Sequence, residues 1–317
     1  MYTTRRKIKK GPIIIVIMII LIVAIAIISF KLYKYYTSYE YKLGEVGYSE
    51  KEIQTLLEKD QKTIDTALKK YDEDLIPLTN EKYFLWKNYK TYKEYINLIS
   101  SKTNKVDYTD IVTKVNTNRN YDYYTHTKKT DMNKKTAILV NKYHYLPEKY
   151  APDNLVKVSN WYAYGDLEIK SEVYEAFKNM FDAAKKEDIT LIINSGYRSY
   201  DYQKSLYDEY KNIQGEKYAD SYAARPDYSE HQTGLALDII TYNTKGKDFE
   251  NTDAFKWLSK NAYKYGFILR YPKDKEDITG YSYESWHYRY LGKDLAKKVK
   301  DSKLTYDEYY AYYLDKD

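Results

Sequence analysis

The sequence predicts an α+β fold for the C-terminal part of the chain, from about residue 136 to residue 317. Short apolar runs typical of strands are interspersed with segments that place apolar residues at helical spacing. The two kinds of segment follow each other irregularly, which indicates a mixed α+β domain rather than regular βαβ repeats. The 317-residue chain has no cysteine, so disulfides, thiolate zinc sites and cysteine nucleophiles are excluded.

The individual elements follow from local patterns in this region. Strands are expected, in chain order, at residues 136–147 (ending at Pro147), 188–197 (stopped by Gly196), 234–240, 267–272 and 285–290. Helices are expected at residues 171–187, 199–212 and 253–266 (ending at Gly266), and further helices close the chain. In the strand "GLALDII", period-two alternation places Leu235 and Leu237 opposite Ala236 and Asp238.

The N-terminal segment predicts a membrane anchor. A basic tail, residues 1–11, precedes an uncharged apolar run at residues 12–30. At 1.5 Å per residue, a helix of this length spans about 28 Å, which matches a bilayer core. The basic flank predicts a single-pass topology with a cytoplasmic N-terminus and an extracellular body.

A cleaved signal peptide is the alternative interpretation of this run. Ala24 and Ala26 have the spacing of a cleavage site, but they lie inside the apolar run, which continues to Phe30. A signal peptide usually has a shorter apolar core, with the cleavage site beyond it. The pattern therefore favours an uncleaved anchor.

Residues 31–135 predict a small helical stalk or accessory module. Ser49 and Glu52 have the spacing of a capping box at the start of one helix, and residues 83–99 form a second amphipathic pattern. The formal charge of the whole chain is +6, but five of these charges lie in the N-terminal tail, so the remainder is close to neutral. The body thus gives no indication of a nucleic-acid partner.

Two of the four histidines have surroundings that fit a metal site. His231 lies in the turn before a strand, and Asp238 lies in that strand seven positions later. His287, expected on a neighbouring strand, can supply a third ligand, and Glu284 lies three positions before it. Catalytic zinc uses about three protein ligands, and without cysteine these are histidine and carboxylate. The residues alone leave open both a zinc site and ordinary roles, such as pairing of Asp238 with a lysine.

Four stretches resemble a known family, in the same order. They are "LVNKYHYLPEKYAP" (139–152), "SGYRSYDYQ" (195–203), "SEHQTGLALD" (229–238) and "ESWHYRY" (284–290). On these stretches the chain resembles the VanY-type D-alanyl-D-alanine carboxypeptidases, in the wider group that includes lysostaphin-type peptidases and the hedgehog signalling domain. The match covers about residues 136–295. It implies that residues 136–317 form an antiparallel-sheet zinc peptidase domain.

The resemblance also implies roles for individual residues. His231, Asp238 and His287 would bind Zn²⁺, and Glu284 would be the catalytic base. Three further residues would contact the substrate: Arg198 at the carbonyl under attack or at the terminal carboxylate, and Gln203 and Ser229 in the pocket for the terminal D-alanine.

The resulting prediction is a membrane-anchored extracellular zinc carboxypeptidase that removes the terminal D-alanine from peptidoglycan stem peptides. An L,D-carboxypeptidase or a peptidoglycan endopeptidase with the same site remains an alternative. An inactive wall-binding module is a more remote one, since loss of activity normally shows as a substituted ligand or base. Signatures of other enzyme classes, namely HExxH, the P-loop and GxSxG, do not occur in the sequence.

Overall fold

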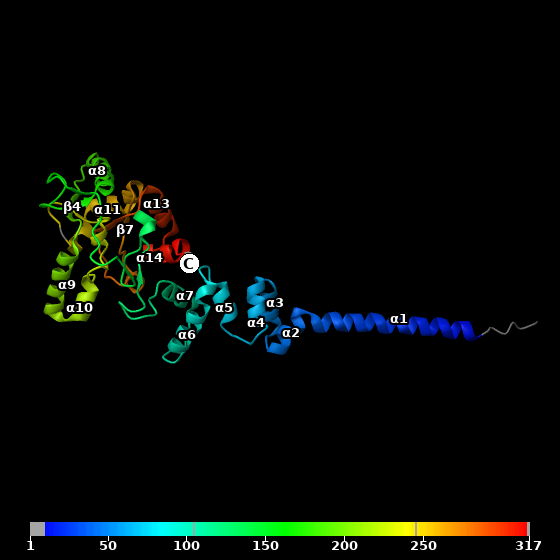
Figure 1. The fold of residues 1–317 in the computed structure, drawn as a ribbon. Coiled ribbons are helices and arrows are strands. Elements are labelled where there is room, and N and C mark those ends of the chain that lie inside the picture. Colours follow the sequence, from blue (N-terminus) through cyan, green and yellow to red (C-terminus); the bar gives the residue numbers. More distant parts are fainter. Residues whose placement is uncertain (1–9, 104, 245, 316–317) are drawn as a thin grey trace, which may run out of the picture. The chain divides into compact units, whose positions relative to one another are not determined.

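A computed structural model describes residues 10–103, 105–244 and 246–315 (Figure 1). Most of the predicted basic tail, residues 1–9, lies outside this range. The chain divides into two compact units, Met1–Phe84 and Leu85–Asp317. Each unit is described by itself below.

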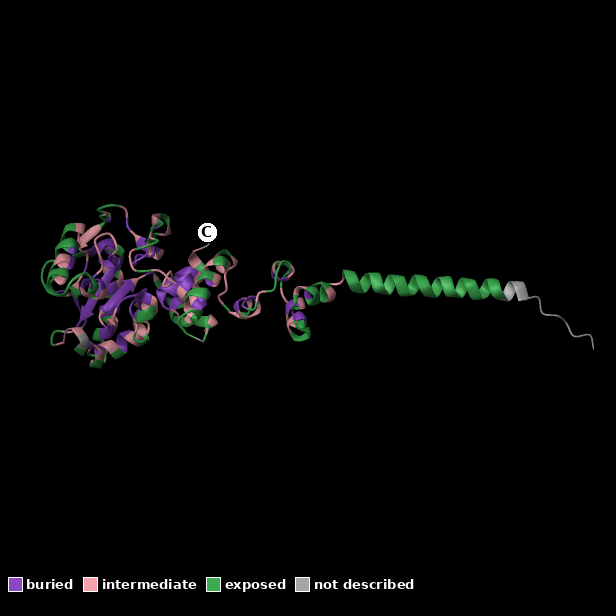
Figure 2. Ribbon diagram, turned by 90° about the horizontal axis from the view of Figure 1, so that it is seen from below, coloured by how far each residue is buried: buried purple, intermediate pink, exposed green. Residues whose placement is uncertain are grey.

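The first unit begins with the long helix α1 (Lys10–Thr37). Its residues 14–37 are exposed along the whole length, as Figure 2 shows. The segment Ile14–Thr37 has a mean hydropathy of 3.1 in its most apolar window, so by length and composition it can cross a membrane. The apolar helix predicted at residues 12–30 is therefore present and extends further toward the C-terminus.

Four short helices complete the first unit: α2 (Tyr39–Val46), α3 (Glu50–Leu57), α4 (Gln61–Ala67) and α5 (Leu75–Asn80). They bury a small set of leucines, among them Leu43, Leu56 and Leu75, which are fully inaccessible. The predicted capping box is confirmed, because the Ser49 side chain and the Glu52 carboxylate each bond the other residue's backbone N–H. This satisfies backbone donors that the first turn of α3 leaves without intrahelical partners.

The second unit begins with α6 (Tyr89–Ser100) and α7 (Tyr108–Asn116), which pack against each other. Residues 83–99 are thus helical only from Tyr89, after a 3₁₀ turn at Trp86–Asn88. The two compact units separate at Phe84, whereas the sequence places the start of the peptidase domain at residue 136. The role of residues 31–135 as a stalk stays a prediction.

A four-stranded antiparallel sheet forms the centre of the second unit, in the order β5-β6-β8-β7. Its strands are β5 (Ile192–Ser195), β6 (Ala236–Ile240), β7 (Phe267–Leu269) and β8 (His287–Tyr290). Each strand lies within a segment predicted as a strand. The antiparallel sheet and the mixed α+β architecture are therefore confirmed.

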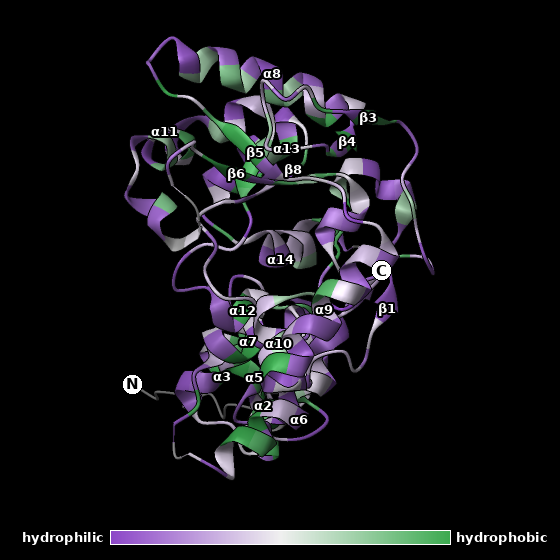
Figure 3. Cartoon of the chain, turned by 90° about the vertical axis from the view of Figure 1, so that its left-hand side faces the viewer, coloured by the Kyte–Doolittle hydropathy of each residue, from purple (hydrophilic) through white to green (hydrophobic). Residues whose placement is uncertain are grey.

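The two faces of this sheet have different surroundings. Leu237 on β6 and Tyr288 on β8 are cross-strand partners and belong to the main apolar core. Helix α8 (Ser171–Lys185) contributes Phe177 and Met180 to the same core, and Figure 3 shows its alternating polar and apolar stripes. Because side chains alternate along a strand, Asp238 lies on the opposite face. One face therefore stabilises the fold, and the other can carry polar side chains.

The remaining helices of the second unit surround the sheet. They are α9 (Tyr200–Gln214), α10 (Glu216–Tyr222), α11 (Asp253–Asn261), α12 (Glu276–Thr279), α13 (Lys293–Ser302) and α14 (Tyr306–Tyr309), followed by a π-helical turn at Tyr310–Leu314. Helices α9 and α10 pack side by side (Figure 1). The helices predicted at residues 171–187, 199–212 and 253–266 correspond to α8, α9 and α11, the last continued by a 3₁₀ turn at Ala262–Tyr265.

Two local predictions differ from the structure. Residues 136–147, predicted as one strand, contain only the two-residue strand β2 (His144–Tyr145), which pairs with β1 (Lys128–Lys129). Residues Ile138 and Val140 are buried without joining a sheet, so their apolar character reflects core packing. The pair β3 (Leu155–Lys157) and β4 (Glu168–Lys170) was not predicted, because strands of three residues are too short to show a clear period.

Candidate metal centre

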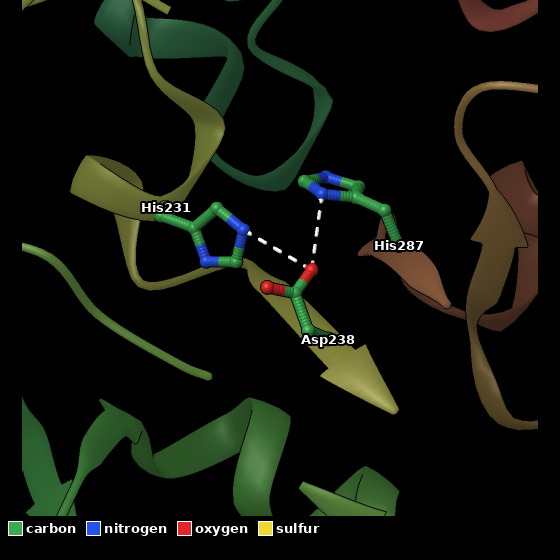
Figure 4. Close-up of side chains that lie close together, drawn as sticks. All are labelled: His231, Asp238 and His287. Atoms are coloured by element: carbon green, nitrogen blue, oxygen red, sulfur yellow. Dashed lines mark ion pairs between the residues drawn. The ribbon is translucent and has the colours of Figure 1, made fainter. Parts of the chain in front are cut away.

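Three side chains converge on the polar face of the central sheet (Figure 4). His231 comes from the 3₁₀ helix Glu230–Thr233, Asp238 from β6 and His287 from β8. The Oδ1 atom of Asp238 lies 3.4 Å from Nε2 of His231 and 3.4 Å from Nδ1 of His287. One donor atom from each residue lies within 4.8 Å of the other two, and all three side chains are buried.

Strand register accounts for this convergence. Asp238 and His287 are direct cross-strand partners between β6 and β8, so their side chains project from the same face. His231 reaches the same point because the chain turns sharply into β6 at Gly234, whose φ of 68° lies in the left-handed region. The sequence placed His231 in a turn ahead of the strand, and the structure agrees.

The outward-facing atoms of these side chains have partners of their own. The contacts are His231 Nδ1 to the Gly196 carbonyl oxygen at 2.7 Å, Asp238 Oδ2 to Arg198 Nη2 at 2.9 Å, and His287 Nε2 to Glu230 Oε2 at 3.4 Å. By contrast, Oδ1 of Asp238 is buried and accepts no hydrogen bond from the described residues. Metal-binding sites typically show this division, in which outer contacts orient the ligands and leave the inner atoms to the ion.

The donor set fits zinc. Two donors that are each about 2.1 Å from one tetrahedral ion lie roughly 3.4 Å apart, which is the separation between the Asp238 oxygen and each imidazole nitrogen. Two imidazoles and one carboxylate, with further positions open, are typical of catalytic rather than structural zinc sites.

The electrostatics of the site keep Asp238 ionised. Burial alone would raise the pKa of the Asp238 carboxyl group, but His231, His287 and Arg198 outweigh it and hold this pKa well below its usual range. Burial lowers the pKa of His231, and the neighbouring Arg198 guanidinium lowers it further. A neutral imidazole and an ionised carboxylate are the forms that bind a metal.

Glu284 lies beside the three donors without being one of the convergent set. Its Oε2 atom is 3.5 Å from Nδ1 of His287. Burial raises the pKa of the Glu284 carboxyl group to about 7, despite the opposing effect of His287. For His287, burial lowers the pKa, but the carboxylates of Asp238 and Glu230 outweigh it and raise the value to about 9 without a metal, so an ion that binds at Nδ1 must displace the proton there.

The convergent side chains open into a cleft of about 330 Å³. Gln203 of α9 and Ser229 both lie in its wall, together with Arg198 and Glu284, so the structure brings all the predicted site residues to one cleft. Gln203 donates to the Ala224 carbonyl oxygen at 2.8 Å, while its buried Oε1 has no partner among the described residues. This oxygen is an acceptor that no described residue uses, and it is buried within the cleft wall.

Arg198 has protein contacts that the sequence did not predict. Its Nη2 bonds Asp238, and its Nε donates to the Ser195 hydroxyl at 3.0 Å. Its side chain is still 20% exposed and lines the cleft. Arg198 therefore holds the carboxylate of Asp238 in place, and the outer edge of its guanidinium can face a substrate.

Several charged residues behind the site were not identified from the sequence. Glu230, Arg270 and Arg289 are completely buried on the same side of the sheet as His287. Arg289 was identifiable, because it lies two positions after His287 on β8 and so shares its face. The face on which Arg270 lies could not be inferred in this way, because Arg270 follows the end of β7.

The other two histidines lie outside this cluster. His126 is exposed and stacks on Tyr121. His144 is buried, and its Nδ1 lies 3.0 Å from Oδ1 of Asn141. Burial lowers the pKa of His144 to about 4, so this side chain is a neutral packing residue.

The chain is similar in sequence and in structure to known proteins. Residues 166–293 match the sequence model of the family VanY, D-alanyl-D-alanine carboxypeptidase. The chain is 48% identical to YodJ of Bacillus subtilis (strain 168) over 182 residues, which are 54% of this chain and 66% of YodJ. The chain therefore spans slightly less than two thirds of that relative.

Two further proteins match over nearly their whole length. The bifunctional D-Ala-D-Ala dipeptidase and carboxypeptidase VanXYC of Enterococcus gallinarum is 34% identical, and the match covers 56% of this chain and 94% of VanXYC. The solved structure of the LdcB LD-carboxypeptidase is 44% identical, with a TM-score of 0.56, over 59% of this chain and 91% of that one. With its motifs and its fold both matched, the chain belongs to the VanY family of D-alanyl-D-alanine carboxypeptidases.

Proposed function

We propose that the protein is a membrane-anchored zinc carboxypeptidase that removes the terminal D-alanine from peptidoglycan stem peptides outside the cell. In this proposal, residues 31–135 form a helical stalk and residues 136–317 the catalytic domain. The observation that carries the proposal is the convergence of His231, Asp238 and His287, whose inner donor atoms point at one another while their outer atoms are already held. Glu284 lies at the edge of this arrangement and faces the cleft.

His231 Nε2, Asp238 Oδ1 and His287 Nδ1 are the atoms that would hold the ion. Zinc, when bound, supplies a Lewis acid that acidifies water and polarises the amide carbonyl of a substrate. Glu284 acts as the general base: it accepts a proton from the attacking water and returns this proton to the leaving amine of D-alanine. Its burial supports this role, because a carboxylate in an apolar setting binds a proton more tightly than one in water.

Substrate contacts fall to residues of the cleft wall. The exposed edge of Arg198 is placed to donate to the carbonyl under attack or to the terminal carboxylate of the substrate. Gln203 and Ser229, both buried in the same wall, would contact the terminal D-alanine. These roles are proposed from the position of the side chains and from the resemblance to the family.

A second candidate function is L,D-carboxypeptidase activity on tetrapeptide stems. The similarity to LdcB, which is named an LD-carboxypeptidase and is 44% identical to this chain, favours it. The two activities share the metal chemistry and differ in the residue on the N-terminal side of the bond that is cut. The cleft wall rather than the metal centre must therefore decide between them.

Digestion of defined muropeptides by the full-length chain tests these activities. We expect a mass loss of one alanine residue from pentapeptide stems, and abolition of this loss by a zinc chelator. Loss of alanine from tetrapeptide stems alone would assign the L,D activity, and separation of cross-linked dimers would assign an endopeptidase. If no muropeptide changes in mass, the proposed enzymatic activity is contradicted and a wall-binding module is favoured.

The anchor in this proposal is α1, which is exposed and apolar over more than the thickness of a bilayer core. Protease added to intact cells should therefore remove the C-terminal domain. Immunoblotting with an antibody against this domain is the measurement, and a cytoplasmic marker protein that stays intact is the control. Protection of the domain until the cells are lysed would exclude the extracellular topology.

Removal of a proposed ligand should abolish zinc binding. His231→Ala leaves only two protein donors, too few for tight binding at a three-ligand site. We expect metal analysis of the purified variant to show little zinc, while His126→Ala, which removes an exposed histidine outside the site, keeps one ion per chain. A full zinc content in His231→Ala would remove this residue from the ligand set.

Replacement of the proposed base should separate catalysis from metal binding. Glu284→Gln keeps all three donors and is nearly isosteric, but the amide cannot accept a proton from water. We expect normal zinc content and a fall in kcat near the upper end of the roughly 10²- to 10⁴-fold range of acid–base catalysis. His287→Ala should instead lose zinc and activity together. Near wild-type turnover in Glu284→Gln would refute its role, and loss of zinc would move Glu284 into the ligand set.

A further inference from the structure

A buried ionic network lies directly behind His287. It consists of two carboxylates and two guanidinium groups, with side-chain exposures of 2% or less: Glu230, Arg270, Arg289 and Asp307. The charges balance, two negative against two positive. Buried ions are tolerated only when such pairing is complete.

Glu230 divides its two oxygens between different partners. Its Oε1 accepts from Arg270 Nε at 2.8 Å and from Arg289 Nη1 at 2.8 Å. Its Oε2 accepts no hydrogen bond from either arginine and lies 3.4 Å from Nε2 of His287. The two arginines therefore fix the carboxylate and leave one oxygen directed at the imidazole.

This contact has a consequence for the imidazole of His287. An imidazole that donates from Nε2 to a carboxylate carries its lone pair on Nδ1. In His287, Nδ1 is the nitrogen that faces Asp238 and the centre of the site. The Glu230 carboxylate thus selects the tautomer that can bind a metal, and it also restrains the orientation of the ring.

The network continues to the C-terminal helix α14. Asp307 accepts from both terminal nitrogens of Arg270, one of them at 3.2 Å, and from Asn141 Nδ2 at 2.8 Å. Arg270 therefore bridges two carboxylates, one from α14 and one beside the metal ligands. Arg289 is held separately, by the backbone carbonyl oxygens of Thr136 and Ile138.

We propose that Glu230 and Asp307 are positioning residues of the metal centre. Glu230 fixes the tautomer and orientation of His287, and Asp307 fixes Glu230 through Arg270. The proposal rests on the proposed function only in taking His287 as a metal ligand. It makes Asp307 of α14, which lies 20 residues after His287 in the chain, part of the proposed zinc site.

Zinc affinity of the full-length chain in detergent, measured by competition with a chromophoric chelator, tests this inference. We expect Glu230→Gln to raise the Kd for zinc about 10- to 100-fold, the usual effect of losing an outer-shell partner of a ligand. Asp307→Asn should raise it by a smaller factor, because Asp307 acts through Arg270. The absorption spectrum of the cobalt-substituted protein should change in Glu230→Gln, since it reports ligand geometry at the ion.

Glu308→Gln is the matched control for Asp307→Asn. Glu308 is the next residue of α14, is equally buried, and bonds Thr305 in a capping box without contacting Arg270. Its replacement should weaken the cap of the helix and leave the zinc Kd unchanged. An equal loss of affinity in both variants would show that only the stability of α14 matters, and would overturn the role of Asp307.

Removal of one buried charge can prevent folding, so a charge-balanced variant is needed as well. Arg270→Met combined with Asp307→Leu removes one positive and one negative charge, and such replacement of a buried pair by apolar side chains is often tolerated. We expect this variant to fold, as judged by circular dichroism, and to bind zinc more weakly than wild type. Wild-type affinity in this variant would overturn the link through Arg270, and wild-type affinity in Glu230→Gln would overturn the inference as a whole.

The outcome also separates this inference from the proposed function. Absence of zinc binding by the unaltered chain would contradict the proposed function and the inference with it. Tight binding by the unaltered chain, with the same Kd in all variants of the network, would leave the proposed function intact and refute the inference alone.

Discussion

The pairing of Asp238 with His287 across β6 and β8 is the constraint on which the site depends. Side chains alternate along a strand, so a slip of one residue would turn one of these two side chains into the apolar core. The register is fixed by that core, because Leu237 and Tyr288 are the neighbouring pair and are completely buried on the other face. The same hydrophobic packing that stabilises the sheet therefore sets Asp238 and His287 side by side, and contacts of their outer atoms with Arg198 and Glu230 then restrain the orientation of each side chain.

Polar groups on the site face are costly to bury, and hydrogen bonds to the outer atoms of His231, Asp238 and His287 offset part of this cost. Asp238 illustrates the arrangement, since Arg198 holds its outer oxygen while its inner oxygen is left for an ion. Glu284 has a different environment: its Oε2 lies 3.5 Å from Nδ1 of His287, and burial dominates its surroundings and raises the pKa of its carboxyl group. Two carboxylates in the same cleft thus have different surroundings, as expected for one that binds a metal and one that exchanges protons.

The sequence predicted the parts of the fold that have a strong period or a clear stop. The strands β5 to β8 and the helices α8 and α11 fall within predicted segments, and α9 continues two residues beyond its predicted end at residue 212. The strand prediction was wrong for residues 136–143 and 146–147, and Ile138, Leu139 and Val140 are apolar because loops also pack into the core. In the site, the sequence placed His231 in a turn and Asp238 in the strand that follows it. The roles of the other site residues were predicted from the resemblance of four motifs to a known family. The role of Asp307 could not be predicted from the sequence. Its link to Glu230 runs through Arg270, and this contact forms only in the folded chain, where Arg270 after β7 meets Asp307 of α14.

A motif that defines the metal centre does not define what the enzyme cuts. In the proposed mechanism, D,D and L,D hydrolysis use the same ion and the same base, because both cut an amide and release D-alanine. They differ in the residue before the bond, and this residue must contact the cleft wall rather than the ligands. In this protein the wall is built by α9 and by the segment from α10 to Ser229, including Gln203 with its unpaired oxygen. Because the register of β6 and β8 holds the proposed ligands independently of these segments, the wall can vary in sequence without moving them, and the relatives include one named for activity on D-Ala-D-Ala and one named an LD-carboxypeptidase.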